Sequence, residues 1–306
     1  REFPAVAVIV VDNANVKIYD GDDPDLPLWM RFRQSTTALG AMVGYTSFSV
    51  GSAIMLNGML MVGMSASNQG NVAGLRLINF ITEEFSWKAN NSNRNSSQHW
   101  PIVDRNGGRS LGYDDGNYIV NEVINDVAAT VLPNAPIDSA TGLPIPTIAV
   151  ATNGGVSVIK DDGSVVDVTA QSGGSYNATS WIDITKNNRL IFEQDSAHRA
   201  VFCIPIPSAD RITATNDGSI TDKVVMKYYS SGTHIPYPCY FGAAIDDAIS
   251  LGEGDNQALV GNNGELTILH PNFDDPEQGK VAYATTSYNT GWMHGDIKGA
   301  FLSDTT

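Results

Sequence analysis

Aspartates are the residues of this sequence whose type and spacing could do chemistry. They form clusters in loop-like segments: Asp20, Asp22, Asp23 and Asp25; Asp114 and Asp115; Asp161 and Asp162; Asp246 and Asp247; Asp274 and Asp275. Glycoside hydrolysis needs two carboxyl groups about 5 to 9.5 Å apart. Aspartate is also favoured in Asp-Gly and Asp-Pro turns, because its carboxylate accepts hydrogen bonds from nearby backbone N–H groups. The turn interpretation covers most of these clusters, so the sequence names no catalytic residue.

The first cluster, Asp20 to Asp25 (DGDDPD), also offers the oxygen ligands that Ca²⁺ prefers. It lacks the ligand spacing of an EF-hand loop and the glutamate that completes such a loop. A solvated acidic loop is therefore favoured over a Ca²⁺ site, and no other cofactor is expected.

Histidine and cysteine form no pattern that indicates a metal site or a nucleophile. The sequence has no His-x-His, His-Glu-x-x-His or Cys-x-x-Cys pair, the spacings that many zinc sites use. Cys203 and Cys239 could pair or could remain as two buried thiols. The histidines are interpreted as surface or hydrogen-bonded residues: His99, His198, His234, His270 and His294. These observations predict a protein that is not an enzyme.

Tryptophan is the other residue type that could build a binding site, because its indole combines a large apolar surface with a polar N–H group. Trp100 lies in a polar segment and is the candidate for contact with a glycan or a partner protein. Trp29 and Trp181 lie in alternating apolar sequence, and they are therefore predicted to belong to the core.

The composition argues against two classes of partner. The net charge is −15 over 306 residues, and such a surface repels nucleic acid and anionic membranes. The most hydrophobic window, Met55 to Met64, is too short to span a membrane and is broken by Gly58 and Gly63. It is predicted to be a buried pair of strands. With 42% hydrophobic and 17% charged residues, the chain can bury a large core.

Short apolar runs between Asn, Asp and Gly turns predict strands throughout the chain. Segment 146–169 predicts three of them: Thr147–Ala151, Val156–Ile159 and Val165–Val168. Asn57-Gly58 between two apolar runs predicts a hairpin. The pattern also predicts a strand over Tyr118–Leu132 and a long surface loop over Lys88–Arg109. The best helical pattern, at Gly242–Ile249, is only two turns long.

Strand–turn–strand units recur near residues 6, 53, 148, 181 and 258. Repeats of about 40 to 50 residues, each a small antiparallel meander, are typical of β-propellers. The predicted fold is all-β, a β-propeller of five or six irregular antiparallel blades in one domain over residues 1–306. A large β-sandwich is the alternative. The chain starts at Arg1 in strand-like sequence, so it is interpreted as a fragment of a longer polypeptide.

Three segments resemble the tail-fibre-like virion structural proteins of tailed bacteriophages: PAVAVIVVDNANVKIYDGDDPDLPLWMRF at 4–32, IAVATNGGVSVIKDDGSVVDVT at 148–169 and YATTSYNTGWMHGDIKGAFLSDTT at 283–306. They lie near the start, in the middle and at the end, so they frame nearly the whole chain. In that family a segment like the last one precedes jelly-roll or laminin-G-like carbohydrate-binding modules. The resemblance implies the propeller part of a longer virion protein, and it implies no catalytic residue.

The expected function is that of a non-enzymatic structural or interaction module of an extracellular virion, such as a tail fibre, an appendage or a decoration protein. Its expected partners are other virion subunits, further copies of itself in a homo-oligomer, and a host-surface glycan. Two alternatives remain open. One is a glycan-active propeller enzyme, a glycosidase or depolymerase with two carboxylates in its funnel. The other is a lectin-like propeller with pockets between its blades.

Overall fold

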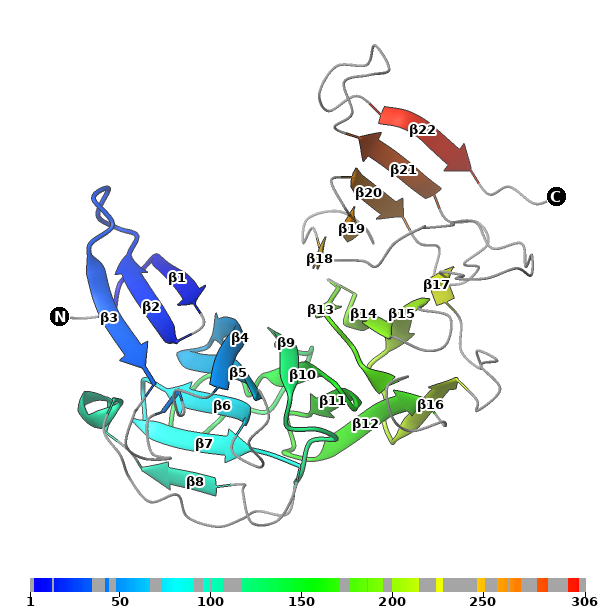
Figure 1. Ribbon diagram of the computed structural model, residues 1–306. Coiled ribbons are helices and arrows are strands. Elements are labelled where there is room, and N and C mark those ends of the chain that lie inside the picture. Colours follow the sequence, from blue (N-terminus) through cyan, green and yellow to red (C-terminus); the bar gives the residue numbers. More distant parts are fainter. Residues whose placement is uncertain are drawn as a thin grey trace. The chain divides into compact units, whose positions relative to one another are not determined.

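A computed structural model shows how the strands are arranged (Figure 1). It describes residues 3–12, 14–34, 42–43, 48–66, 73–90, 96–99, 101–106, 117–170, 177–185, 187–194, 200–214, 224–227, 247–250, 258–262, 265–270, 280–285 and 297–302. This part of the chain is all-β, with strands β1 to β22 and a short 3-10 helix at Ile102–Asp104. The chain divides into two compact units, Arg1–Asp167 and Val168–Thr306.

The first unit begins with two antiparallel sheets, each a meander in which consecutive strands are neighbours. The N-terminal sheet has the strand order β1 (Ala7–Asp12), β2 (Asn15–Asp20) and β3 (Leu28–Arg33). The second sheet has the strand order β4 (Phe48–Leu56), β5 (Met59–Ala66), β6 (Gly74–Asn79), β7 (Glu84–Lys88) and β8 (Ser96–His99).

The third sheet follows the same meander: β9 (Ile124–Thr130), β10 (Thr147–Thr152), β11 (Gly155–Ile159) and β12 (Val165–Ala170). From Val168 onward, β12 belongs to the second unit and pairs in parallel with β16 (Arg211–Ala214).

The second unit also contains a sheet of four strands and a sheet of five. The first of these contains β13 (Ile182–Ile184), β14 (Arg189–Gln194), β15 (Ala200–Pro205) and β17 (Val224–Lys227). The other contains β18 (Asp247–Ser250), β19 (Ala258–Asn262), β20 (Glu265–His270), β21 (Lys280–Thr285) and β22 (Ile297–Leu302).

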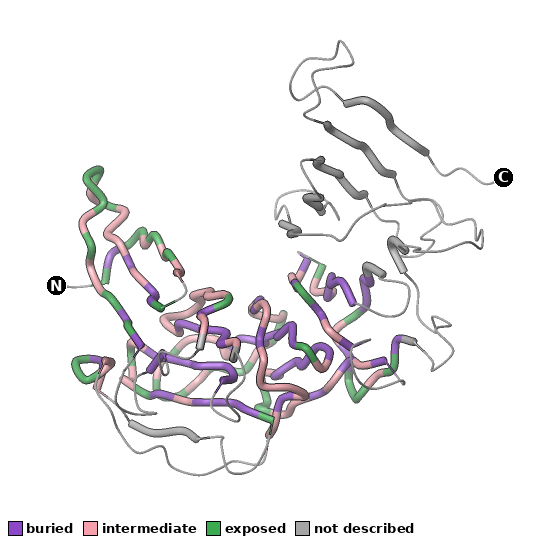
Figure 2. Tube along the Cα trace, viewed as in Figure 1, coloured by how far each residue is buried: buried purple, intermediate pink, exposed green. Residues whose placement is uncertain are grey.

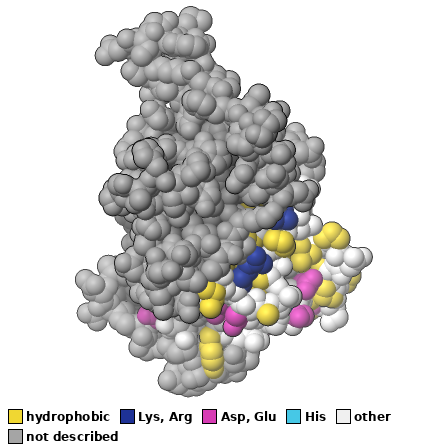
Figure 3. All heavy atoms as spheres, turned by 90° about the vertical axis from the view of Figure 1, so that its right-hand side faces the viewer, with side chains coloured by type: hydrophobic (Ala, Val, Ile, Leu, Met, Phe, Trp, Pro, Cys, Tyr) yellow, Lys and Arg dark blue, Asp and Glu magenta, His cyan; other side chains and the backbone are white. Residues whose placement is uncertain are grey.

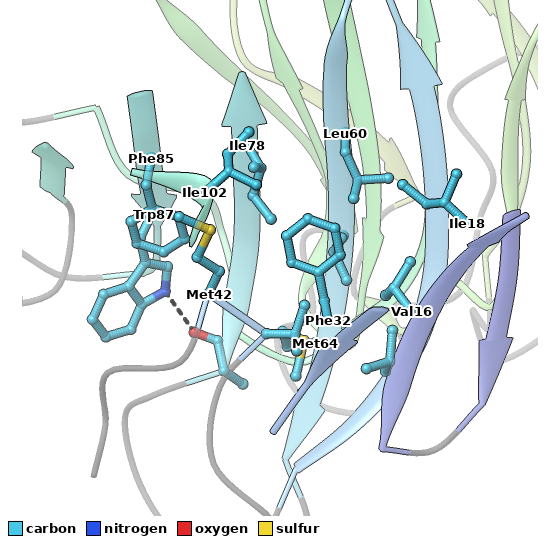
Figure 4. Close-up of a cluster of buried hydrophobic side chains, with 14 of the residues drawn as sticks. Val16, Ile18, Phe32, Met42, Leu60, Met64, Ile78, Phe85, Trp87 and Ile102 are labelled. Carbon is cyan, nitrogen blue, oxygen red and sulfur yellow. Dashed lines mark hydrogen bonds between the residues drawn. The ribbon is translucent and has the colours of Figure 1, made fainter. Parts of the chain in front are cut away.

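The N-terminal and second sheets enclose one apolar core (Figure 4). Its fully buried members include Val16, Ile18, Phe32, Leu60, Val62, Met64, Ile78 and Phe85. Trp87 closes the core at one side, where its indole N–H donates to the carbonyl of Ala73 at 2.9 Å. Burial of one such large side chain stabilises the fold by about 1.5 to 3 kcal/mol. This core therefore fixes the first sheet on the second.

The second sheet also packs on the third sheet through its opposite face. Successive residues of a strand point to opposite faces, so β5 directs Leu60 and Val62 into the first core and Met61 into another. Met61 packs there with Ile124, Ile148 and other residues of the third sheet. At Gly63 a Cβ atom would lie 2.6 Å from Cγ2 of Ile124, so glycine allows the close approach. The second sheet is therefore a middle layer with two apolar faces.

Burial differs between the first strand and the interior strands. Figure 2 shows β1 alternating between exposed and intermediate residues, whereas β10 and β11 are buried along their whole length. On the face drawn in Figure 3, the described side chains are a mixture of apolar, acidic and basic types.

The structure confirms the all-β class and the best-defined strands. The three strands predicted in segment 146–169 are β10, β11 and β12. The hairpin predicted at Asn57-Gly58 joins β4 and β5, and its two residues have φ values of 50° and 73°. Positive φ at both positions is the geometry of a type I′ turn, for which Asn-Gly is favoured.

Three local predictions were wrong. The strand predicted over Tyr118–Leu132 is only β9, Ile124–Thr130, because Asn121 turns the preceding backbone by accepting a hydrogen bond from the N–H of Val123 at 2.8 Å. The loop predicted over Lys88–Arg109 contains β8 and the 3-10 helix. Of the helical pattern at Gly242–Ile249 the structure describes only residues 247–249, which lie in strand β18, since pairing with β19 outweighs a weak local preference. The single domain over 1–306 stays a prediction.

Candidate functional site

The strongest candidate for an interaction surface is the solvent-facing side of the N-terminal sheet. Val6, Val8 and Val10 expose 56%, 39% and 41% of their surface there. The residues between them, including Ala7 and Ile9, point the other way and pack on the core of the first two sheets. β1 is therefore apolar on both faces, and only one face is covered within the first unit. A contiguous exposed apolar surface commonly marks an interaction site.

The neighbouring strands extend this surface. Directly paired residues of an antiparallel sheet lie on the same face, and Val8 pairs with Tyr19, which pairs with Leu28. Val10 pairs with Lys17, which pairs with Arg31. We call this surface the outer face, and it comprises Val6, Val8, Val10, Lys17, Tyr19, Leu28 and Arg31. It has an apolar part at one end of the strands and a charged part toward the other end, where Lys17 is paired with Asp12.

The two edges of this sheet differ. On the β3 edge, Asn106 Oδ1 accepts from the N–H of Arg33 at 2.7 Å, and Arg105 Nε donates to the carbonyl of Arg31 at 2.8 Å. On the β1 side of the sheet, Gly21 N donates to the carbonyl of Val6 at 2.8 Å. Val6 and every second residue after it therefore direct their backbone N–H and C=O groups toward β2. The backbone groups of Ala7 and its alternate neighbours point away from β2. In the described part of the chain no strand pairs with this edge of β1.

Acidic residues fill the turn between β2 and β3. Asp22 accepts hydrogen bonds from the backbone N–H groups of Ala5 at 2.7 Å and Val6 at 3.2 Å. Asp20 accepts from the N–H of Asp22, and Asp23 accepts from the N–H of Asp25. These bonds confirm the turn interpretation for this cluster. No group of three or more His, Cys, Asp or Glu side chains that could hold a metal ion occurs among the described residues.

The single charged residue of β1 is neutralised locally. The carboxylate of Asp12 lies 2.8 Å from Nζ of Lys17. Hydrogen bonds from Lys17, from the Asn15 side chain and from the N–H of Ala14 hold the pKa of Asp12 well below its usual range. Asp12 therefore stays ionised throughout the neutral range and ties the end of β1 to β2.

The other predicted site residues divide into those inside and those outside the described residues. Asp162 accepts from both the N–H and the hydroxyl of Ser164, which confirms its turn role. Trp100, the residue predicted to contact a glycan or partner, lies outside the described residues. The same holds for the side chains of these residues: His99, His198, His234, His270, His294, Asp114, Asp115, Asp246, Asp247, Asp274, Asp275 and Cys239.

The described tryptophans lie in or against apolar cores, as predicted for Trp29 and Trp181. Trp181 is buried, and Trp29 packs edge-on against Phe3 with ring centres 4.9 Å apart. Trp87 is also buried and lies opposite Arg76, whose guanidinium is 4.1 Å from the centre of the indole. Burial lowers the pKa of Arg76. These contacts give the three indoles a packing role.

Cys203 on β15 is a free thiol in a buried position. Burial raises its pKa from 9.0 to about 11, and the guanidinium of Arg189 opposes this rise only in part. A buried protonated thiol is a poor nucleophile.

The outer face is not among the sites predicted from the sequence. The signal was present in residues 4–11 (PAVAVIVV), an uncharged run that is apolar at both odd and even positions. Such a run predicts a strand that is covered on both faces.

Comparisons with known proteins give no family assignment. No protein-family model matches the sequence. A search of curated proteins finds no match. Within the described residues, no helix is long and apolar enough to cross a membrane.

Solved structures show distant similarity. Kluyvelomyces marxianus Hsv2 is 11% identical, with 88% of this chain and 76% of that chain covered and a TM-score of 0.34. The Dos1 propeller is 10% identical, with 86% and 64% covered and a TM-score of 0.37. A protein of unknown function from Bacteroides caccae is 9% identical, with 96% and 92% covered and a TM-score of 0.32.

Proposed function

We propose that the chain is a β-propeller of five or six blades that serves as a non-enzymatic interaction module of a bacteriophage virion. Support for the fold comes from the way the sheets of the first unit pack. Each is an antiparallel meander, and the three lie face to face, with β4 against both β1 and β9. Blades of a propeller repeat in this manner.

The outer face is the observation that carries the proposal. A propeller blade packs between two neighbours, so its sheet must be apolar on both faces. The middle sheet of the first unit meets this requirement through Leu60 on one side and Met61 on the other. The N-terminal sheet meets it through Ile18 on the inside and Val8 on the outer face. A two-sheet sandwich would leave such a second apolar face without a role.

A non-enzymatic role is supported by how the described carboxylates are used. Asp22, Asp23 and Asp162 accept backbone hydrogen bonds in turns. The resemblance of segments 4–32, 148–169 and 283–306 to virion proteins supports an extracellular particle as the location. Other virion subunits, further copies of the chain and a host-surface glycan are the partners that we propose.

A paired binding and digestion screen tests the function. The purified chain is applied to a glycan array and incubated with bacterial polysaccharides, and reducing ends are measured. We expect no release of reducing ends, because the proposed module lacks a catalytic pair. Cleavage that is lost on mutation of a carboxylate would establish the enzyme alternative instead.

Trp100 is tested in the same screen. If the chain binds a glycan, Trp100→Ala should weaken that binding about tenfold, which corresponds to the loss of one stacking contact. Trp87→Phe is the control, because Trp87 is buried in the first core. Equal affinity of Trp100→Ala and the original chain would remove Trp100 from the proposed site.

A further inference from the structure

Strand β16 leaves its own sheet to pair with another strand. It lies between β15 and β17 in the sequence, and these two strands pair with each other. β16 instead pairs in parallel with β12, with Thr169 opposite Ile212. The chain thus runs from the sheet of β13, β14, β15 and β17 to β12 and then returns, so β16 connects that sheet to β12.

The backbone pairing between β12 and β16 is short. Three residue pairs join β12 and β16, and the register shifts between Thr169 and Ala170. Parallel pairs are slightly less stable per residue than antiparallel pairs. Ile212, in the middle of β16, exposes 52% of its surface and so contributes little buried apolar surface. Another interaction must contribute to holding β16 in place.

A buried threonine supplies that interaction. Thr213 is fully buried, and its Oγ1 lies 3.1 Å from the carbonyl oxygen of Thr169 on β12. The same hydroxyl forms a hydrogen bond with the side-chain amide of Gln194 on β14, which is also fully buried. One side chain therefore joins three strands that are far apart in the sequence.

The proton count fixes the direction of these bonds. A hydroxyl has one proton, so Thr213 cannot donate to Thr169 and to Gln194 at once. With the amide oxygen toward Thr213, the amide nitrogen of Gln194 has no hydrogen-bond partner in the part of the chain that the structure describes. Exchange of the two amide positions, which have nearly the same shape, lets Gln194 donate to Thr213 while Thr213 donates to Thr169. The two hydrogen bonds can then form at the same time.

Polar groups at the end of β12 add further hydrogen bonds to this series. Asn177 Oδ1 accepts from the backbone N–H of Ala170 at 2.6 Å. The hydroxyl of Thr179, which is fully buried, donates to the carbonyl of Asn177 at 3.3 Å. The end of β12 is therefore fixed by polar contacts inside the second unit, and burial makes each contact costly to lose without replacement.

We propose that β16 is a clasp, a detachable strand locked by the Thr213 hydroxyl. When it is closed, it links the four-stranded sheet to β12 and covers the edge of β12. When it is open, that edge presents unpaired backbone N–H and C=O groups, which pair readily with strands of other chains. This role does not depend on the proposed virion function, since it follows from contacts within the second unit.

The test compares the same substitution at two buried threonines. Thr213→Val removes the hydroxyl that locks the clasp while keeping the shape of the side chain. Thr147→Val is the matched control, because Thr147 is also fully buried but its hydroxyl has no hydrogen-bond partner among the described residues. Hydrogen exchange of peptides covering β16 and β10 is measured for both variants of the 306-residue chain. We expect exchange in β16 to accelerate about tenfold or more in Thr213→Val, with β10 unchanged.

Two further variants keep the test decisive. Thr213→Ser retains the hydroxyl and should keep exchange in β16 within about twofold of the original chain. Gln194→Met removes the amide at similar volume and should open β16 as Thr213→Val does, which covers the case that Thr213→Val fails to fold. Equal β16 exchange in Thr213→Val, Gln194→Met and Thr147→Val would overturn the clasp.

Sedimentation velocity tests the covered edge. Thr213→Val should self-associate with rising concentration, whereas Thr147→Val should sediment like the original chain. A clasp that opens without any added association would overturn the role of β16 as a cover for β12. Neither result depends on glycan binding or on polysaccharide cleavage, so a failure here is separate from a failure of the proposed function.

Discussion

Strands β1 and β10 have similar sequences and different surroundings. β1 reads AVIVVD and β10 reads TIAVAT, and both are mostly apolar. β10 lies between β9 and β11 and is buried along its whole length. β1 has β2 on one side only, and its outer valines are exposed within the first unit. The apolar composition of a strand therefore indicates that both of its faces are suited to burial. The number of neighbouring strands and sheets decides how many of those faces are buried.

Val150 marks the covered end of this comparison. It is fully buried on β10, so Val150→Asp places an unpaired charge in the core of the first unit. We expect a loss of about 4 kcal/mol in the free energy of unfolding, measured by urea denaturation with tryptophan fluorescence. Val103→Asp is the control, because Val103 is 80% exposed and should change stability by less than about 0.5 kcal/mol. Similar values for the two variants would mean that β10 is not an interior strand.

Cys203 extends the comparison to the second unit. Its pKa of about 11 means that the folded protein at pH 8 contains about a hundredfold less thiolate at this position than an ordinary cysteine. We expect iodoacetamide to label Cys203 much more slowly in the native chain than in urea, as measured by peptide mass spectrometry. Equal rates would show that β15 is not an interior strand.

The same shift has a consequence for pH. The folded-state pKa of Cys203 lies above its ordinary value of 9.0, so the native state holds the proton more tightly than the unfolded state. Its contribution to stability is complete below pH 9 and is lost as the pH rises toward 11. Cys203→Ala should therefore show a shallower loss of stability over this window than the original chain.

Val8 tests what covers the outer face. The proposed propeller needs a further blade against Val8, so Val8→Asp should lower the free energy of unfolding by about 2 kcal/mol. This is less than the effect of Val150→Asp, because Val8 lies nearer the edge of its sheet. A change below about 0.5 kcal/mol, the usual range for solvent-exposed positions, would indicate that the outer face is exposed to solvent. That result would count against the closed ring of blades in the proposed propeller.

Thr147 gives the smallest effect and the opposite sign. Its hydroxyl on β10 is fully buried, and no described residue forms a hydrogen bond with it. Thr147→Val replaces that group with a methyl group of similar size, so we expect a gain of about 1 kcal/mol in the free energy of unfolding. A loss of stability would show that the hydroxyl has a partner that stabilises the native state, such as a buried water molecule.

Much of the fold could be predicted locally. Asn57-Gly58 predicted its hairpin because the positive φ of a type I′ turn suits these residues. The turn roles of Asp22 and Asp162 follow from the short reach of an aspartate side chain. Strand β8 was missed, since its sequence, SSQH, contains no apolar residue and its place in the sheet depends on pairing with β7.

The candidate sites were harder to predict. The polar surroundings of Trp100 predict a contact site at that residue, whereas exposed apolar side chains of the described residues form the outer face around Val8. The clasp could not be predicted at all, because Thr169, Gln194 and Thr213 meet only when strands far apart in sequence pair and pack. No local pattern indicates that a strand will leave its own sheet.

The sequence by itself determined the β class, the positions of most strands and the turns between them, because backbone preferences and alternating apolar residues act over a few neighbours. Tertiary structure alone decided which apolar faces are covered, which edges are capped and which polar groups are buried together. Those outcomes depend on contacts between residues such as Thr213 and Thr169, which are separated by 44 positions in the chain. The free energy of such contacts exists only once the sheets have packed.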